Sequence, residues 1–426
     1  MEIIKYPLRE DWAKIIARPV FNHSYLFESV KNILEDVRLN GDKAVAAYGK
    51  KFDMVYLEDF LVTSDETDEA ERLISGDLKT AICLASSNIE IFHRSQQLVS
   101  RKIETIPGVV CWQKAVGIEK VGVYIPGGMA PLFSTVLMLA IPARIAGCGE
   151  IILCTPPAKD GKVHPAILYA ASHAGVSRIF KIGGVQAIAA MTYGTETVPK
   201  VYKIFGPGNQ YVTAAKQLVS MRDVAIDMPA GPSEVEVIAD DTANPAFVAA
   251  DILSQAEHGT DSQAVFVTTC EEFVNQVLEE INTQLNELPR KELAEQSLQH
   301  SRIVVLKDNN EVIDFTNAYA PEHLIIETKD YAALAEQVTN AGSVFLGHFT
   351  PESAGDYASG TNHTLPTNGY ARMYSGVNLD SFVKKITFQE ISQEGIRNIG
   401  QATTTMAQAE SLQAHSNAVS LRLANN

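Results

Sequence analysis

The chain has 426 residues, of which 46% are hydrophobic and 20% are charged, so it has enough apolar side chains for a folded core. At this length we expect two or three compact units rather than one. With 35 basic and 51 acidic residues, the formal net charge is -16. Such a charge argues against a surface that binds nucleic acid.

Two further features exclude a membrane protein and a targeting segment. The longest apolar run, residues 135–141, is much shorter than the roughly 20 residues that a membrane span requires. The first ten residues, MEIIKYPLRE, lack the charged start and apolar stretch of a secretory signal, and they lack the Arg and Ser bias of a transit peptide. We therefore expect a cytoplasmic protein that uses neither a membrane nor a nucleic acid as a partner.

The five cysteines give no sign of a disulfide framework or of a thiolate zinc site. Their number is odd and no two of them form a CxxC pair. Cys154 lies in the apolar run IILCT, where we expect a small buried side chain. The five are Cys83, Cys111, Cys148, Cys154 and Cys270.

The first ~110 residues are expected to be helical, because apolar residues recur there at helical spacing. In the clearest stretch, Leu26, Val30 and Leu34 share one face with Ile33 and Val37 nearby. Gly41 is expected to end this helix.

From Lys120 onward, short apolar runs alternate with helical segments. The first runs are VGVYI (121–125), IILCT (151–155), RIFKI (178–182) and VYKIF (201–205). Runs rich in Val and Ile that recur about every 25 residues with helices between them predict parallel βαβ units. A second series predicts a second α/β half, with strands at 234–239, 264–269, 302–306, 324–328 and 343–347.

After Gly376 the sequence becomes a polar helical tail, residues 390–423, without a strand signal. A tail of this kind buries little apolar surface by itself. We expect it either to pack on a second subunit or to fold back on its own domain.

Glycine-rich turns follow three of the predicted strands, in VYIPGGMAP, KIGGVQA and IFGPGNQYV. In parallel α/β sheets, ligands bind beyond the carboxyl ends of the strands. Glycines let the backbone approach a diphosphate, and the helix N-termini that follow supply N–H donors. None of the turns matches GxGxxG, since Tyr211 stands where the last glycine would be. Three successive turns nevertheless favour a nucleotide site.

The second half carries the ionisable candidates. Gln255 and His258 lie three residues apart near the end of a predicted helix, so they share a face. Asp356, His363 and His415 follow later in the chain. Zinc favours imidazole and carboxylate ligands where thiolates are absent. A metal site and a set of unrelated polar residues both remain open, because a lone histidine usually has an ordinary polar role.

Glu322 and His323 form a second candidate group. They lie in a polar break, YAPEHLIIE, just before a predicted strand. One interpretation is an acid–base pair, and the other is an acidic residue that ends a helix beside a half-buried histidine. The residues alone leave both open.

Together, these segments resemble the histidinol dehydrogenase family. The resemblance extends from Lys120 almost to the end of the chain, in the family's order, and the first ~110 residues carry little of it. The matching strings are VGVYIPGG, PLFSTVLMLAIPARIAGC, KIFGPGNQYV, DMPAGPSE, LSQAEHG, YAPEHL, AGDYASGTNHTLPT and LQAHSNAV.

The resemblance implies a role for each matching residue. Glu322 and His323 would be the catalytic acid–base pair. The implied zinc ligands are Gln255, His258, Asp356 and, from the partner subunit's tail, His415. The implied histidinol contacts are Ser233, His363, Glu410 and His323, together with the four zinc ligands. The implied NAD contacts are Tyr124, Gln186 and Asn209.

The implied fold is α/β, with two incomplete Rossmann-like domains and helical N- and C-terminal extensions that intertwine a homodimer. The expected division gives residues 1–22 to an N-terminal extension and residues 121–233 to an NAD-binding domain. Residues 23–120 would join 234–376 in a substrate- and zinc-binding domain, and residues 377–426 would form a helical tail for dimerisation.

The implied activity is the NAD-linked, four-electron oxidation of L-histidinol through the aldehyde to L-histidine, with one zinc ion per subunit. One rival is an aldehyde dehydrogenase with a cysteine nucleophile, which needs a partly exposed, activated thiolate. The other is a non-catalytic zinc- or nucleotide-binding protein of the same fold. Such a protein would have no reason to pair Glu322 with His323 beside the ligand set.

Overall fold

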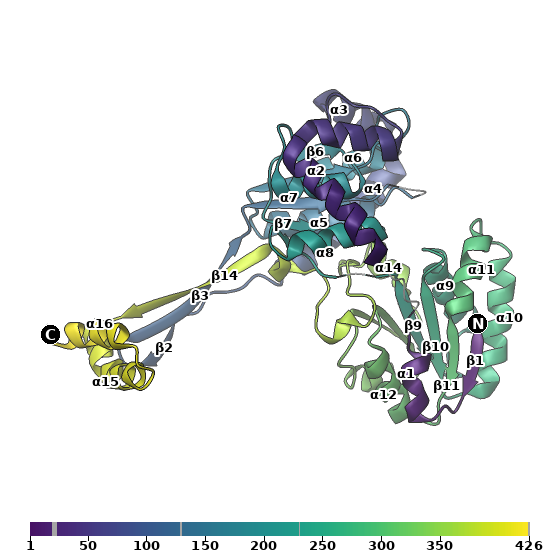
Figure 1. The fold of residues 1–426 in the computed structure, drawn as a ribbon. Helices are drawn as coiled ribbons and strands as arrows, with labels where there is room; N and C mark the ends of the chain where they lie inside the picture. The colour runs from purple at the N-terminus through teal and green to yellow at the C-terminus, as the bar shows by residue number, and fades with distance from the viewer. Residues whose placement is uncertain (19–23, 128–129, 230, 425–426) are drawn as a thin grey trace.

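The computed structural model describes residues 1–18, 24–127, 130–229 and 231–424. They form two α/β lobes and an arm that extends away from both (Figure 1). None of the helices in these ranges is long and apolar enough to cross a membrane.

One lobe is built on a six-stranded parallel sheet with the order β1-β11-β10-β9-β12-β13. Helices α9, α10 and α11 cover one face and α1 and α12 the other, so the central strands β9, β10 and β12 are buried on both sides. The strands are β1 (Glu2–Lys5), β9 (Glu234–Ala239), β10 (Gln263–Thr268), β11 (Arg302–Val305), β12 (His323–Glu327) and β13 (Ser343–Leu346). The helices are α1 (Trp12–Ile15), α9 (Pro245–Ala256), α10 (Glu271–Leu285), α11 (Lys291–His300), α12 (Asn309–Tyr319), α13 (Tyr331–Ala335) and α14 (Glu352–Tyr357).

The other lobe is built on a five-stranded parallel sheet with the order β6-β5-β4-β7-β8. Helix α5 is buried almost all round, because it lies between this sheet and helices α4 and α6. The strands are β4 (Lys120–Tyr124), β5 (Glu150–Thr155), β6 (Arg178–Lys181), β7 (Lys203–Phe205) and β8 (Ala225–Ile226). The helices are α2 (Ser24–Tyr48), α3 (Ser64–Leu73), α4 (Gly76–Arg94), α5 (Phe133–Ile145), α6 (Pro165–Ala174), α7 (Gly184–Tyr193) and α8 (Gln210–Ser220).

The packing corrects the expected domain division at two places. Helix α2 packs on α7 and α8, α3 on α6, and α4 on α5, so residues 24–94 belong to the five-stranded lobe and not with 234–376. Their apolar faces complete that lobe's outer layers, as when Leu26, Val30 and Val37 join its core. At the N-terminus, β1 pairs with β11 as an edge strand of the six-stranded sheet, so residues 1–18 are part of that lobe.

The arm corrects two further expectations. Its three-stranded antiparallel sheet has the order β14-β3-β2, with β2 (Ile103–Ile106), β3 (Val109–Gly117) and β14 (Val383–Ile391). Strands therefore occur where the sequence predicted only helix before residue 110 and no strand in the tail. Helices α15 (Gln393–Ala409) and α16 (Gln413–Ala424) follow at the tip (Figure 1).

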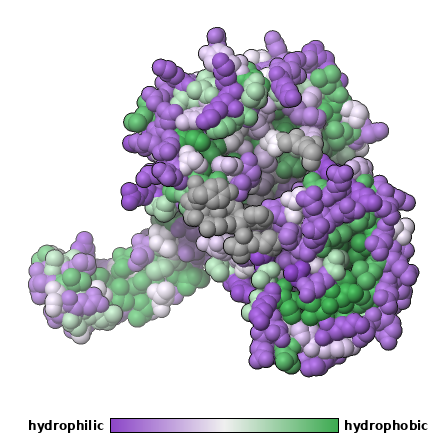
Figure 2. All heavy atoms as spheres, turned by 45° about the vertical axis from the view of Figure 1, so that its right-hand side comes forward, coloured by the Kyte–Doolittle hydropathy of each residue, from purple (hydrophilic) through white to green (hydrophobic). Residues whose placement is uncertain are grey.

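Apolar side chains of the arm remain uncovered within one chain. Ile103, Ile386, Phe388 and Ile391 are exposed, and hydrophobic surface extends along the arm in Figure 2. A surface of this kind commonly marks an interface with another protein.

Gly41 interrupts α2, as expected: a first helical stretch ends there, and a second one continues across a kink. Its φ of 52° and ψ of -135° are not helical, and the second stretch runs from there to Tyr48. A Cβ atom at this position would overlap the carboxylate of Glu196, whose Oε2 accepts a hydrogen bond from Asp42 N at 2.8 Å. Only glycine combines this backbone conformation with this close approach.

We expect Gly41→Ala to destabilise the protein by about 1–3 kcal/mol, because alanine is strained at this φ and clashes with Glu196. Urea unfolding would measure the difference. Gly76→Ala is the matched control, since Gly76 begins α4 and an added Cβ there meets no atom within 4 Å. Equal midpoints for the two variants would contradict the role of Gly41.

Candidate functional site

A cleft of about 1150 Å³ opens at the carboxyl end of the five-stranded sheet. The turns after β4, β5, β6 and β7 line it, as expected for a ligand site in a parallel α/β sheet. The structure brings together here all three residues predicted to hold NAD, namely Tyr124, Gln186 and Asn209.

Each of the three has a defined local role. The Tyr124 hydroxyl, at the end of β4, accepts a hydrogen bond from Gly184 N at 3.0 Å. Gln186 is buried, and its Oε1 has no partner among the described residues. Asn209 caps α8 by accepting hydrogen bonds from the N–H groups of Tyr211 and Val212. The N-termini of α7 and α8 thus meet at the cleft, where their N–H groups favour an anion.

The cleft also contains residues that the sequence analysis missed. Tyr48, Lys51, Phe52 and Asp53 line it from the end of α2 and the π-helical turn Gly49–Asp53. The rings of Tyr48 and Phe52 stack with centroids 5.6 Å apart. Asp53 lies 3.4 Å from Gln186 Nε2, and burial raises its pKa to about 6. The only local signal was an aromatic pair at helical spacing.

A second group of polar side chains gathers at the amino end of the six-stranded sheet. Glu322 and His323 stand at the start of β12, and Glu352 and Asp356 project from α14. Ligand atoms of His258, Glu352 and Asp356 all lie within 4.8 Å of one another. The predicted residues His258, His323 and Asp356 therefore converge.

His323 is the centre of this group. Its Nδ1 lies 3.8 Å from both Glu322 Oε2 and Glu352 Oε1, and its Nε2 lies 3.6 Å from Asp356 Oδ1. Burial lowers the pKa of His323, but the carboxylates of Glu352, Glu322 and Asp356 outweigh it and raise the pKa to about 10. The imidazole is thus an imidazolium when no other cation is near.

The pKa values of the surrounding carboxyl groups are shifted in different directions. Burial raises the pKa of Glu322 to about 7 and that of Glu352 to about 8. Burial also acts to raise the pKa of Asp356, but the positive charge of the neighbouring His323 outweighs it and lowers this pKa below its ordinary value. Asp356 is therefore the carboxylate that stays ionised, and Glu322 titrates near neutral pH, as a general base requires.

The polar atoms of this group fit a divalent cation. Gln255, at the end of α9, is fully buried, and neither atom of its side-chain amide has a hydrogen-bond partner within the described ranges. The same holds for both oxygens of Glu352 and for Asp356 Oδ1. Buried polar atoms without partners are rare in native proteins and indicate an ion or ligand. Oxygen and imidazole donors of this kind suit zinc.

His363 joins the two parts of the site. Its Nδ1 lies 2.9 Å from the carbonyl oxygen of Asp356, and its Nε2 lies 3.0 Å from Thr135 Oγ1 on α5 of the other lobe. Beside it, Asn362 Nδ2 donates to the carbonyl oxygen of Met138 at 2.6 Å. Ser233 lies directly before β9, at the same end of the sheet as Glu322.

Two predicted site residues are not brought to this place within one chain. Glu410 follows α15 and His415 lies in α16, at the tip of the arm and far from α9 and α14 (Figure 1). Both side chains are exposed.

Glu352 was missed from the sequence, although it lies four residues before Asp356 on the same helix face. That spacing was the available signal.

The cysteines give no support to a thiol enzyme. None of the five is among the described residues that line the cleft. Cys154 is fully buried, as expected, and burial raises the pKa of its thiol. Burial likewise raises the pKa of Cys148 to about 11, so neither is an activated thiolate.

Comparison with known proteins agrees with this geometry. The family model described as histidinol dehydrogenase matches residues 16–423. A histidinol dehydrogenase from Bacteroides thetaiotaomicron is 66% identical over 423 residues, 99% of each chain. A chloroplastic histidinol dehydrogenase from Arabidopsis thaliana is 52% identical, and the match covers 96% of this chain and 88% of the relative.

Structural comparison gives the same result. A crystal structure of histidinol dehydrogenase from Elizabethkingia anophelis matches with a TM-score of 0.98 at 57% sequence identity, covering 100% of this chain and 98% of that one. A match of this identity over the whole chain confirms the resemblance seen in the ordered motifs. The chain belongs to the histidinol dehydrogenase family.

Proposed function

We propose that this chain catalyses the zinc-dependent, NAD-linked, four-electron oxidation of L-histidinol through L-histidinaldehyde to L-histidine. The observation that carries the proposal is the buried group of Glu322, His323 and Asp356, tied through His363 to the lobe that contains the cleft. A base, a candidate cation site and a dinucleotide cleft are thereby held in one assembly. A non-catalytic binding protein would not need the base.

For the cation we propose Gln255, His258 and Asp356 as ligands, completed by His415 of a second subunit. One carboxylate and three neutral ligands would leave zinc with a net charge of about +1. Zinc would supply an anchor for the imidazole and amino nitrogens of histidinol, and a positive charge that lowers the proton affinity of His323. Two observations support these ligands: the buried side-chain amide of Gln255 has no hydrogen-bond partner among the described residues, and His258 is exposed.

For the substrate we propose contacts with Ser233, His363 and Glu410, with His323 and the cation ligands around the same space. Glu410 and His415 would come from the second subunit, because both lie on the arm in this chain. The exposed apolar side chains of the arm support a homodimer, since a partner subunit would cover them.

For the cofactor we propose that Tyr124, Gln186 and Asn209 hold NAD in the cleft. The meeting of two helix N-termini there favours the diphosphate, and the stacked Tyr48 and Phe52 offer an apolar wall. NAD would supply the hydride acceptor for both oxidation steps, so two molecules would be used for each histidinol.

His323 and Glu322 would divide the proton transfers between them. His323 would accept the proton of the alcohol as the first hydride leaves, which gives the aldehyde. Glu322 would then accept a proton from a water molecule that attacks the aldehyde carbon, while His323 returns its proton to the aldehyde oxygen, which gives the hydrate. His323 would accept the hydroxyl proton of the resulting hydrate as the second hydride leaves, which gives the acid. The pKa of about 7 for Glu322 suits a base at neutral pH.

The activity is tested by the stoichiometry of the reaction. Purified protein mixed with histidinol and NAD should form about two NADH for each histidinol consumed, because the alcohol loses four electrons in two hydride transfers. A chelator that strips the metal should abolish both steps, and added zinc should restore them. A ratio near one, or a rate that the chelator leaves unchanged, would contradict the proposal.

The role of Glu322 is tested by Glu322→Gln. We expect this change to slow the oxidation of histidinaldehyde on the order of 10² to 10⁴-fold, since the amide cannot accept a proton from water. The alcohol step should change far less. Single-turnover NADH formation from histidinol and from histidinaldehyde would separate the two steps.

Glu336→Gln is the control for that variant, since Glu336 is an exposed carboxylate after α13. Equal losses on both steps in Glu322→Gln would remove Glu322 from the role of water-activating base.

A further inference from the structure

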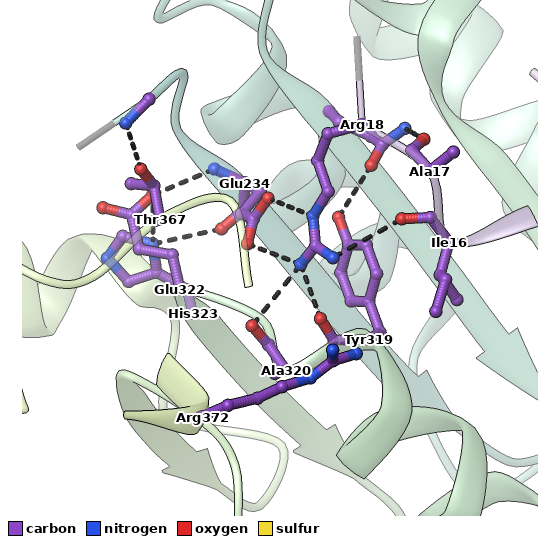
Figure 3. Close-up of polar contacts among 12 residues, drawn as sticks. Ile16, Ala17, Arg18, Glu234, Tyr319, Ala320, Glu322, His323, Thr367 and Arg372 are labelled. Atoms are coloured by element: carbon purple, nitrogen blue, oxygen red, sulfur yellow. Dashed lines mark hydrogen bonds and ion pairs between the residues drawn. The ribbon is translucent and has the colours of Figure 1, made fainter. Parts of the chain in front are cut away.

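Arg18 belongs to a buried ion pair that no part of the proposed reaction uses directly. Its Nε and Nη2 atoms donate to Glu234 Oε2 and Oε1, each at 2.8 Å, so the guanidinium grips the carboxylate with two parallel hydrogen bonds (Figure 3). Nη2 also donates to the carbonyl oxygen of Tyr319 at 2.6 Å, and the guanidinium lies 3.9 Å from the centre of the Tyr319 ring. The two charged side chains are 11% and 1% exposed.

Glu234 is the first residue of β9, and its peptide groups reach both proposed catalytic residues. Its N–H donates to Glu322 Oε2 at 2.9 Å, and its carbonyl oxygen lies 3.4 Å from His323 Nδ1 (Figure 3). One residue therefore sets the position of the carboxylate and of the imidazole. Movement of Glu234 would therefore displace both Glu322 and His323.

The ion pair controls where this residue can lie. A carboxylate buried as completely as that of Glu234 is very costly without a partner, so it would turn toward water if Arg18 were lost. The planar guanidinium matches both carboxylate oxygens at once, which fixes direction as well as distance. Arg18 also comes from the segment before α2, far away in sequence from β9 and β12.

We propose that Arg18 is a positioning residue for this reaction, which holds Glu234 so that its N–H and carbonyl oxygen orient Glu322 and His323. The inference rests on the proposed function of the latter two. It assigns Arg18 no contact with substrate, cation or NAD. A misplacement of about 1 Å in such a group can cost on the order of 10²-fold in rate.

The kinetic test compares Arg18→Lys and Arg18→Met with the wild type. Arg18→Met should lower kcat for histidinaldehyde on the order of 10²-fold, with less change in the KM for NAD, whose proposed cleft lies in the other lobe. Arg18→Lys keeps the charge but loses the two-pronged grip, so its kcat should lie between those of the other two proteins.

Arg302→Met is the matched control. Arg302 also holds the N-terminal segment, through an ion pair with Glu2 at 3.1 Å, and that pair lies on β1 and β11 away from Glu234. Its kcat should equal that of the wild type. The inference would be overturned if Arg18→Lys had the same kcat as Arg302→Met. It would also be overturned if the Arg18 variants changed only the KM for NAD, by raising it.

A crystal structure of Arg18→Lys with zinc bound provides a readout that does not depend on activity. We expect the hydrogen bond between Glu234 N and Glu322 Oε2 to be longer or absent. Retention of that bond at 2.9 Å would overturn the inference even if the variant were slow. A wild-type protein that oxidises no histidinol would contradict the proposed function, while this structural comparison would still decide the role of Arg18.

Discussion

Three carboxyl groups, of Glu322, Glu352 and Asp356, surround the buried imidazole of His323, and water is largely excluded from them. Removing charges from water costs several kcal/mol for each ion, which is comparable to the whole free energy of unfolding of a domain. Burial raises the pKa of Glu322 to about 7 and that of Glu352 to about 8, and the neighbouring carboxylates add to this, because one imidazolium cannot offset three of them. This excess of negative charge is what a divalent cation would relieve, and it explains why buried oxygens remain without partners.

The charged group and the cleft lie on different lobes. Strands β9 and β12 deliver the charged group at their amino ends, while β4 and β7 end in glycine turns beside the cleft. The charged group and the cleft therefore lie at opposite strand ends of two different sheets. The hydrogen bonds of His363 to Thr135 and of Asn362 to Met138 hold the two ends together.

Much of the core could be predicted from the sequence because its signals are local. The runs 121–125 and 151–155 are buried on both faces in a parallel sheet, so they are apolar throughout and match β4 and β5 within a residue. The glycine turns after β4, β6 and β7 correctly indicated where the cleft lies, and the three residues that the family resemblance implied for NAD, Tyr124, Gln186 and Asn209, line it. The first stretch of α2 and its stop at Gly41 were also predicted, but the kink that leads into a second helical stretch up to Tyr48 was not.

What the sequence did not reveal depends on contacts between distant segments. Strand β14 is exposed along almost its whole length and pairs with β3, some 270 positions earlier, so neither has the apolar pattern of a core strand. The placement of α2 to α4 on the five-stranded lobe depends on which faces meet, and no local pattern records that. Glu352 became a candidate only when α14 placed it within 4.8 Å of His258 and Asp356.

We propose that the site is shared between two subunits. This proposal is tested most directly by mixing two inactive variants, His258→Asn and His415→Asn, after separating and reassembling their subunits. If each site takes residue 258 from one chain and residue 415 from the other, half of the dimers are mixed and each has one intact site, so about a quarter of wild-type activity should return. No recovery of activity in a mixture shown to contain mixed dimers would contradict the account.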